Sequence, residues 1–196
     1  SLTDVSYFVP TVYLDQNGYN SSDVNWQVIP GAAGRGVALL SGKIPCGATD
    51  VTSTLILTGQ PGNKFHIVAT LAALEPNFPF QMYYTTKAYF LAHTDICLAL
   101  LKANLIAYRW AQTKSNYMAF APSIVGASIN NTVLSQSYDL LKSTGIWNPN
   151  LPWNITIANT IANITATFHL VTQYAPPANW ANFTLYNQAI TAEGKV

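Results

Sequence analysis

Short apolar runs separated by turn-forming residues are the feature that most restricts the fold of this chain. The runs are rich in β-branched and aromatic side chains, which strands favour. They lie at residues 50–58, 64–74, 80–93, 96–101, 105–110, 154–172 and 183–189. Turn signals such as Asn-Gly, Pro-Gly and Pro-Pro punctuate the chain. This spacing predicts an all-β domain, a β-sandwich or a jelly-roll-like barrel.

Apolar and polar residues alternate within these runs. In residues 50–58, Val51, Leu55 and Leu57 share one face of an extended chain. The alternation in residues 154–172 changes phase near Asn163. A one-residue slip exchanges the two faces of a strand, so the phase change predicts a bulge or a tight turn there.

One segment has the spacing of a helix instead. Residues 132–142 repeat apolar side chains at helical intervals. Asn131 or Thr132 is placed to cap the start of this helix, and Gly145 stands just beyond its end. The sequence therefore predicts one short helix within the β-domain.

The N-terminal residues 1–14 are apolar on both faces of an extended chain, yet they include Pro10. Proline is tolerated at sheet edges rather than in central strands. One interpretation is the first strand of the sandwich. The other is a strand that completes the sheet of a neighbouring subunit. The residues of that donor-strand interface would be Val5, Tyr7, Phe8, Val9, Val12 and Leu14. The predicted organisation is a tail and linker at residues 1–23 and a β-sandwich head at residues 24–196.

Charged residues make up only 9% of the chain, whereas an ordinary soluble domain has about 25%. Aromatic residues make up 12%, which argues against disorder. The net charge is +1 and the basic residues are scattered singly, which argues against nucleic acid as a partner. A nearly neutral surface has little self-repulsion, so this composition favours association, whether by unspecific aggregation or by ordered assembly.

The sequence predicts no membrane span. The most apolar stretch, residues 96–110, is interrupted by Lys102, Asn104 and Arg109. It is also shorter than the roughly 20 residues that a spanning helix needs. The first residue is Ser1, which is expected for a processed, secreted chain and equally for a trimmed one.

Two features indicate an exterior location. The acceptor triplet for N-linked glycosylation, Asn-x-Ser/Thr, occurs at Asn20, Asn130, Asn154, Asn163 and Asn182. Glycans there would supply the hydrophilic cover that charge does not; the alternative is a polar surface on strands. Cys46 and Cys97 form a disulfide in an oxidising compartment or remain two buried thiols.

No motif with a known catalytic mechanism occurs in the sequence, and no catalytic, metal-binding or cofactor-binding residue is predicted. The three histidines lie singly within apolar runs, and the carboxylates are few and dispersed. Five tryptophans allow a carbohydrate-binding interpretation, with Trp147 and Trp153 the candidates for exposed stacking surfaces. The alternative is that the tryptophans fill a core or a subunit interface.

These features resemble those of the extracellular thread filament subunits of thermoacidophilic archaea. The shared features are low charge, a β-domain rich in Thr, Asn and Tyr, scattered acceptor triplets and a detached N-terminal strand. The long hydrophobic N-terminal helix of type IV pilins and archaellins is missing. The resemblance implies that residues 1–14 insert as a donor strand into the next subunit, and that the five triplets carry glycans. Pro10 departs from an ideal donor strand and would have to lie where no main-chain donor is needed.

The functional hypothesis is a non-enzymatic structural subunit of an extracellular, cell-surface filament that serves adhesion or cell–cell contact. Its partners would be identical subunits, joined head to tail by donor-strand complementation in a helical homopolymer. Two alternatives remain open at this point: a jelly-roll capsid protein of a virus and a secreted carbohydrate-binding module.

Overall fold

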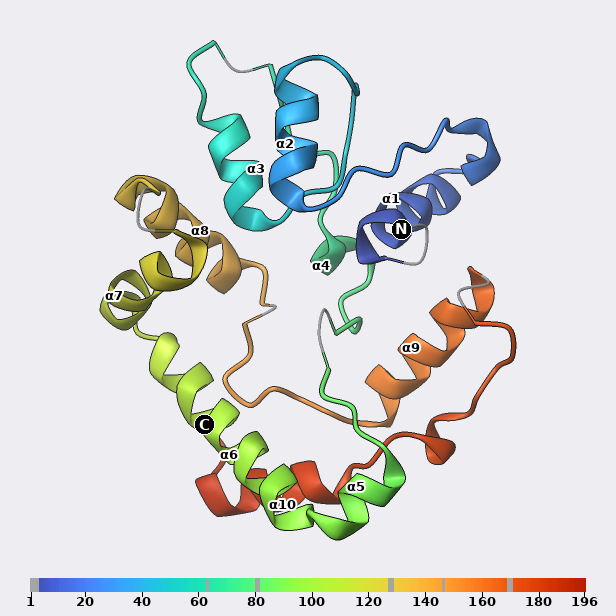
Figure 1. The fold of residues 1–196 in the computed structure, drawn as a ribbon, viewed down its shortest axis with the longest axis vertical. Helices are drawn as coiled ribbons and strands as arrows, with labels where there is room; N and C mark the ends of the chain where they lie inside the picture. Colours follow the sequence, from blue (N-terminus) through green and yellow to red (C-terminus); the bar gives the residue numbers. More distant parts are fainter. Residues whose placement is uncertain (1–3, 63, 80–81, 127–128, 146, 169–170) are drawn as a thin grey trace. The chain divides into compact units, whose positions relative to one another are not determined.

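The computed structural model shows that the all-β prediction is wrong. It describes residues 4–62, 64–79, 82–126, 129–145, 147–168 and 171–196. Among these residues 60% are helical, and none belongs to a strand, a sheet or a barrel. The chain is therefore all-α, and neither the β-sandwich nor the jelly roll is present (Figure 1).

The helices follow one another along the whole chain (Figure 1). Their bounds are α1 (Val5–Gln16), η1 (Ser21–Asp23), α2 (Ala32–Leu40), α3 (Val51–Thr58), α4 (Leu71–Leu74), α5 (Lys87–Ala92), α6 (Thr94–Ala111), α7 (Lys114–Val125), α8 (Asn131–Ser143), α9 (Ile155–Thr167), η2 (Pro177–Asn179) and α10 (Thr184–Glu193). The elements η1 and η2 are single turns of 3₁₀-helix.

The chain forms two compact units. Unit 1 comprises Ser1–Pro76 and Ala127–Thr144, and unit 2 comprises Asn77–Gly126 and Gly145–Val196. Residues 4–23, which the sequence interpretation assigns to a tail and linker, contribute α1 and η1 to unit 1.

Unit 1 is built from α1, α2, α3, α4 and α8. Helix α3 packs against both α2 and α8, and α1 packs against α4 and η1. Leu134 of α8 is fully buried, and Phe8 of α1 and Leu57 of α3 are nearly so. Tyr7 of α1 meets the indole ring of Trp26 edge to face, with ring centroids 4.7 Å apart. These apolar contacts give unit 1 a core of its own.

Unit 2 is organised around the contact between α6 and α10, the most extensive helix pairing described (Figure 1). Leu105 of α6 and Leu185 and Ala189 of α10 are buried. The small Ala189, which is fully buried, is the kind of residue that lets two helix backbones approach closely. Helix α6 also packs against α5 and α7, while α9 packs against η2.

Short polar side chains determine where many of the helices begin. Asp50 Oδ1 accepts the N–H of Ser53 at 2.8 Å, and Asn154 Oδ1 accepts the N–H of Ile157 at 3.1 Å. Asp4, Thr70, Thr86 and Asn130 cap α1, α4, α5 and α8 in the same way. Such residues satisfy N–H groups that the first turn of a helix leaves without partners. The Asn, Asp and Thr content of the chain therefore serves helix capping in addition to polar cover.

The predicted short helix is confirmed as α8, with small shifts at its ends. Asn130, one residue before the predicted cap, accepts the Thr132 N–H at 2.7 Å. Gly145 lies beyond the end with a φ of +69°, a left-handed conformation that glycine adopts without steric cost.

Residues 5–14 do not form the extended donor strand predicted for residues 1–14, of which residues 1–3 lie outside the described part of the chain. Residues 5–14 form most of α1, where Phe8, Thr11 and Val12 are buried, and Val5, Tyr7, Val9 and Leu14 are half-buried. Buried positions 8, 11 and 12 lie three and four residues apart, on one side of a helix. Pro10 is tolerated inside α1 although it removes one backbone donor, and the Thr11 hydroxyl donates to the Tyr7 carbonyl at 2.9 Å.

Ser137 of α8 has a fully buried hydroxyl with no hydrogen-bond partner among the described residues. Replacing it by alanine removes the uncompensated polar group at nearly constant volume and improves helix propensity. We expect Ser137→Ala to raise the free energy of unfolding by about 0.5–1.5 kcal/mol, measured by chemical denaturation. Ser135→Ala on the same helix, at a half-buried position, is the control and should change the unfolding free energy by less. A loss of stability in Ser137→Ala would contradict this account.

Candidate self-association surfaces

Among the described residues, no group of three or more His, Cys, Asp or Glu residues is close enough to hold a metal ion. Burial raises the pKa of Tyr108 to about 12, so its phenol is neutral at physiological pH. Burial also raises the pKa of Tyr117 and of Tyr186. These shifts move the phenols away from acid–base work near neutrality.

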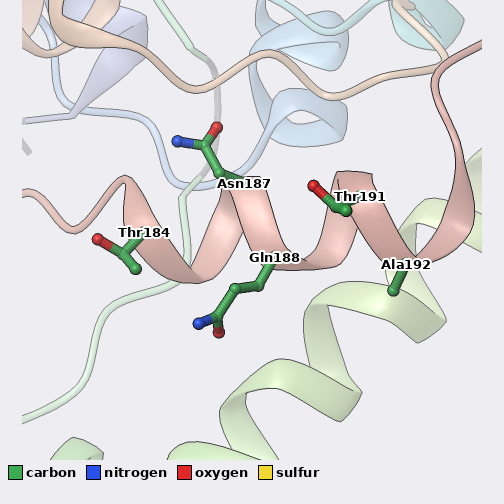
Figure 2. Close-up of a pocket in the computed structure, with 5 residues that line it drawn as sticks. All are labelled: Thr184, Asn187, Gln188, Thr191 and Ala192. Carbon is green, nitrogen blue, oxygen red and sulfur yellow. The ribbon is translucent and has the colours of Figure 1, made fainter.

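Two hollows on the described surface were compared for chemical groups. One, of about 430 Å³, runs along α10, and Figure 2 shows that all five of its lining side chains come from that single helix. The lining consists of Thr184, Asn187, Gln188, Thr191 and Ala192. The other, of about 410 Å³, lies in unit 1 between α3 and residues 129–133. Neither lining includes a side chain that titrates near neutral pH.

The outer face of α6 is an apolar surface that extends from Ile96 to Trp110. It consists of exposed residues at intervals of three and four, with no charged or polar member. We call it the α6 stripe: Ile96, Ala99, Leu100, Ala103, Ile106, Ala107 and Trp110. The four large side chains are each 46% to 54% exposed. Positions 96, 103 and 110 are seven residues apart, the spacing by which one helix presents a seam to another.

The inner face of α6 holds the helix in unit 2. Besides the packing of Leu105, the Lys102 Nζ lies 3.3 Å from the Glu193 Oε1 of α10. The Arg109 guanidinium donates to the carbonyls of Pro149 at 3.2 Å and Glu193 at 2.9 Å. It also donates to Asn150 Oδ1 and to the Gly194 carbonyl. We call Arg109 and these four acceptors the Arg109 clamp. Since the inner face makes these contacts, the α6 stripe has a fixed orientation within unit 2.

Unit 1 carries a second, shorter apolar surface on α2. Ala33, Val37 and Leu40 are exposed at intervals of four and three residues, and we call them the α2 stripe. Val37 is 66% and Leu40 is 53% exposed. The opposite side of α2 contributes the buried Ala38 and Leu39. Each unit therefore presents its own apolar helix face.

Sequence reasoning missed the α6 stripe because it assigned residues 96–101 and 105–110 to two separate strands. In the helix, Lys102 makes the ion pair with Glu193, and Asn104 accepts the Tyr83 hydroxyl at 2.6 Å. The polar residues that interrupt this apolar stretch thus lie beside the apolar face. The seven-residue repeat from Ile96 to Trp110 was the signal in the sequence that identifies the stripe.

All five predicted glycosylation residues are exposed on the structure. Asn20 and Asn130 belong to unit 1, and Asn154, Asn163 and Asn182 belong to unit 2. Asn163 lies inside α9, and the other four lie at or just before the start of a helix. The Asn163 amide is therefore attached to helical backbone, whereas the other four amides stand where a helix begins.

The cysteines and two tryptophans complete the predicted sites. Cys46 of unit 1 and Cys97 of unit 2 are thiols in the structure, the first exposed and the second half-buried, and the disulfide stays a prediction. The expectation that Trp147 is exposed is wrong, since it is buried between the rings of Tyr108 and Tyr117. Trp153 is half-buried beside Trp180 and Phe183.

No described helix combines the length and the apolar character needed to cross a membrane. No family model, curated protein or solved structure matches the chain.

Proposed function

We propose that this chain is a non-catalytic structural subunit that assembles with identical copies into an extracellular filament. Assembly proceeds through exposed apolar helix faces and not by strand donation, because residues 5–16 form a helix. The observation that carries the proposal is the α6 stripe, seven exposed positions on one helix face without a polar side chain. Contiguous apolar surface of this kind is rare on monomeric proteins and marks an interaction site.

The low charge of 9% supports the same proposal, because it adds little repulsion between copies.

The presence of one apolar stripe on each unit supports an open assembly. When the α6 stripe of one copy meets the α2 stripe of the next, the contact is heterologous, and a heterologous contact that does not close a ring produces a filament. Half-burying the six large stripe side chains contributes about 5–10 kcal/mol, which is similar to the cost of association. We therefore expect assembly to depend strongly on protein concentration.

Placing a charge in either stripe tests the proposal. Ile106→Lys and Val37→Lys should each abolish polymers, because assembly would bury an unpaired ammonium group. The measurement is light scattering and sedimentation velocity on the full chain. Thr191→Lys, which adds the same charge at an exposed position outside both stripes, is the control and should assemble normally. Assembly of Ile106→Lys at the wild-type concentration, or a wild-type chain that stays monomeric, would overturn the proposal.

Mixing the two variants distinguishes the heterologous contact from a symmetric one. Ile106→Lys retains a working α2 stripe, and Val37→Lys retains a working α6 stripe. An equimolar mixture should therefore form mixed dimers and no polymers, whereas neither variant forms dimers alone. If α6 instead meets α6, Val37→Lys will assemble like the wild type, and the heterologous arrangement is wrong.

A further inference from the structure

We infer that four of the five Asn-x-Ser/Thr triplets, at Asn20, Asn130, Asn154 and Asn182, are N-glycosylation sites of the folded chain, and that the triplet at Asn163 is not. The sequence treats the five triplets alike, and the structure separates them. The inference is independent of filament assembly.

The four acceptor amides share one arrangement. In each, the side-chain oxygen accepts a backbone hydrogen bond, and the side-chain nitrogen, which forms the bond to the sugar, makes none. Asn20 Oδ1 accepts the Ser22 N–H at 3.0 Å, and Asn130 Oδ1 accepts the Thr132 N–H at 2.7 Å. Asn154 and Asn182 accept N–H groups three residues ahead, at 3.1 Å and 3.2 Å. The Nδ2 of these exposed residues makes no hydrogen bond within the described part of the chain.

The hydroxyl residues of the four triplets are equally accessible. Ser22, Thr132, Thr156 and Thr184 are exposed, and their hydroxyls make no hydrogen bond to a described residue. A transferring enzyme reads this hydroxyl together with the amide, so both must be reachable. The four triplets also lie at the starts of helices, where backbone N–H groups have no intrahelical partner. The N–H groups of these triplets therefore lie outside the helical hydrogen-bond ladder, although the carbonyls of Asn130 and Asn154 accept from Leu134 and Ala158.

The triplet at Asn163 has the opposite properties. Asn163 is exposed but lies in the interior of α9, so the backbone of residues 163–165 belongs to the helix. The Thr165 hydroxyl is half-buried and donates to the Ile161 carbonyl at 2.8 Å and to the Ala162 carbonyl at 3.2 Å. Presentation of this triplet to the enzyme requires unwinding of α9. The folded helix buries Ile157, Ala158 and Ile164, so unwinding would expose these apolar side chains. The Asn163 amide is therefore accessible to the enzyme, whereas the Thr165 hydroxyl and the helical backbone of the triplet are not.

The reaction is the transfer of an oligosaccharide from a lipid-phosphate-linked donor. The bond from asparagine Nδ2 to the first sugar carbon forms while the bond from that carbon to the phosphate oxygen breaks. The electron pair leaves with the lipid phosphate, and the amide proton passes to a base of the transferase. After transfer Oδ1 remains an acceptor, so the cap at α8 or α9 survives modification. The attached sugar is bulky and solubilising, and it suits a surface with 9% charged residues.

In vitro transfer to the folded, unmodified full chain tests the inference. The chain is produced in a host without N-glycosylation and incubated with a single-subunit oligosaccharyltransferase and a lipid-pyrophosphate-linked oligosaccharide. Glycopeptide mass spectrometry should find sugar at Asn20, Asn130, Asn154 and Asn182. Transfer at Asn163 should be at least about ten-fold slower, because it needs local opening of α9. In a synthetic peptide of residues 160–168, which has no such helix, Asn163 should be modified readily.

A matched variant separates the acceptor role from the capping role. Thr132→Ala destroys the triplet but keeps the backbone N–H that Asn130 accepts. It should lose one glycan with the unfolding midpoint unchanged. Transfer to Asn163 of the folded chain at the rate of the other sites would overturn the inference. Refusal of the four sites by the folded chain, when peptides of the same triplets are accepted, would overturn it as well. Assembly is measured on the unmodified chain, so the two proposals fail separately.

Discussion

Replacing Phe8 by alanine should lower the free energy of unfolding by about 3–5 kcal/mol, the cost of deleting a buried aromatic side chain and leaving a cavity. Phe8 is 2% exposed in α1, beside the equally buried Val12. The loss should concentrate in unit 1, where α1 packs against α4. Denaturant unfolding of the full chain measures the total, and hydrogen–deuterium exchange identifies the unit that opens.

The control for Phe8→Ala is Asp15→Ala, on the same helix at an exposed position. A surface substitution of this kind changes stability by about 0.5 kcal/mol or less. The comparison also distinguishes two roles for this segment: a helix in the core of unit 1, or the donor strand that the sequence predicted for residues 1–14. A donor strand reaching into a neighbour would leave the stability of the monomer unchanged when Phe8 is truncated. That result would show that α1 does not contribute to the core of unit 1.

The second large effect is expected at the Arg109 clamp. Arg109→Ala should destabilise unit 2 by about 2–4 kcal/mol, because several charge-assisted hydrogen bonds are lost together and part-buried carbonyls lose their donor. Arg109 joins α6 to the loop at Pro149 and Asn150 and to the end of α10 at Glu193. We expect hydrogen exchange in α10 to accelerate along with the loss of stability.

Two variants sharpen the Arg109 test. Arg109→Lys keeps the charge but not the planar fork that reaches acceptors on two segments, so it should recover only a minor part of the loss. Lys102→Ala removes a partly exposed ion pair on the same helix, at 3.3 Å from Glu193. An exposed pair contributes about 1 kcal/mol or less, so this variant should unfold nearly like the wild type. Equal losses for Lys102→Ala and Arg109→Ala would show that charge, and not the hydrogen-bond geometry, holds α10.

The sequence predicted one helix of this all-α chain and assigned most of the others to strands. The reason is visible in α9. Ile157, Ile161 and Ile164 are spaced by four and three residues, which is a helical repeat. Read as an alternating strand, the same spacing forces a change of phase near Asn163, which predicts a bulge or a tight turn. Over a short window rich in Ile and Thr, both periods fit, and β-branched composition favoured the wrong one.

The capping residues carried the missing information. Asp50, Thr86 and Asn154 each stand before an apolar segment and each accept an N–H of the first helical turn. The sequence interpretation included all three in predicted strands, at residues 50–58, 80–93 and 154–172, and so did not use them as helix-start signals. Helix starts are local and can be recognised from such pairs. The packing of α6 on α10 joins residues far apart in sequence, so it and the resulting α6 stripe follow only from the tertiary structure.

The predictions of site residues also depended on whether the information is local in the sequence or arises from tertiary packing. The Asn-x-Ser/Thr triplets are local and could be located from sequence, yet the difference between Asn130 and Asn163 depends on where helices begin. Arg109 was noted only as a charge that interrupts an apolar stretch. Its role arises because residues 149–150 and 193–194 come together around one guanidinium.

The interleaving of the two units has a consequence for synthesis of the chain. Unit 1 needs α8, whose Leu134 and Ser137 are fully buried, but residues 77–126 of unit 2 are made before it. At roughly 5–20 residues per second, the ribosome adds that segment in about 3–10 s. During this time α3 has emerged without the helix that covers it. A nascent chain therefore exposes an incomplete apolar core for seconds, and a fragment that ends at residue 76 cannot complete unit 1.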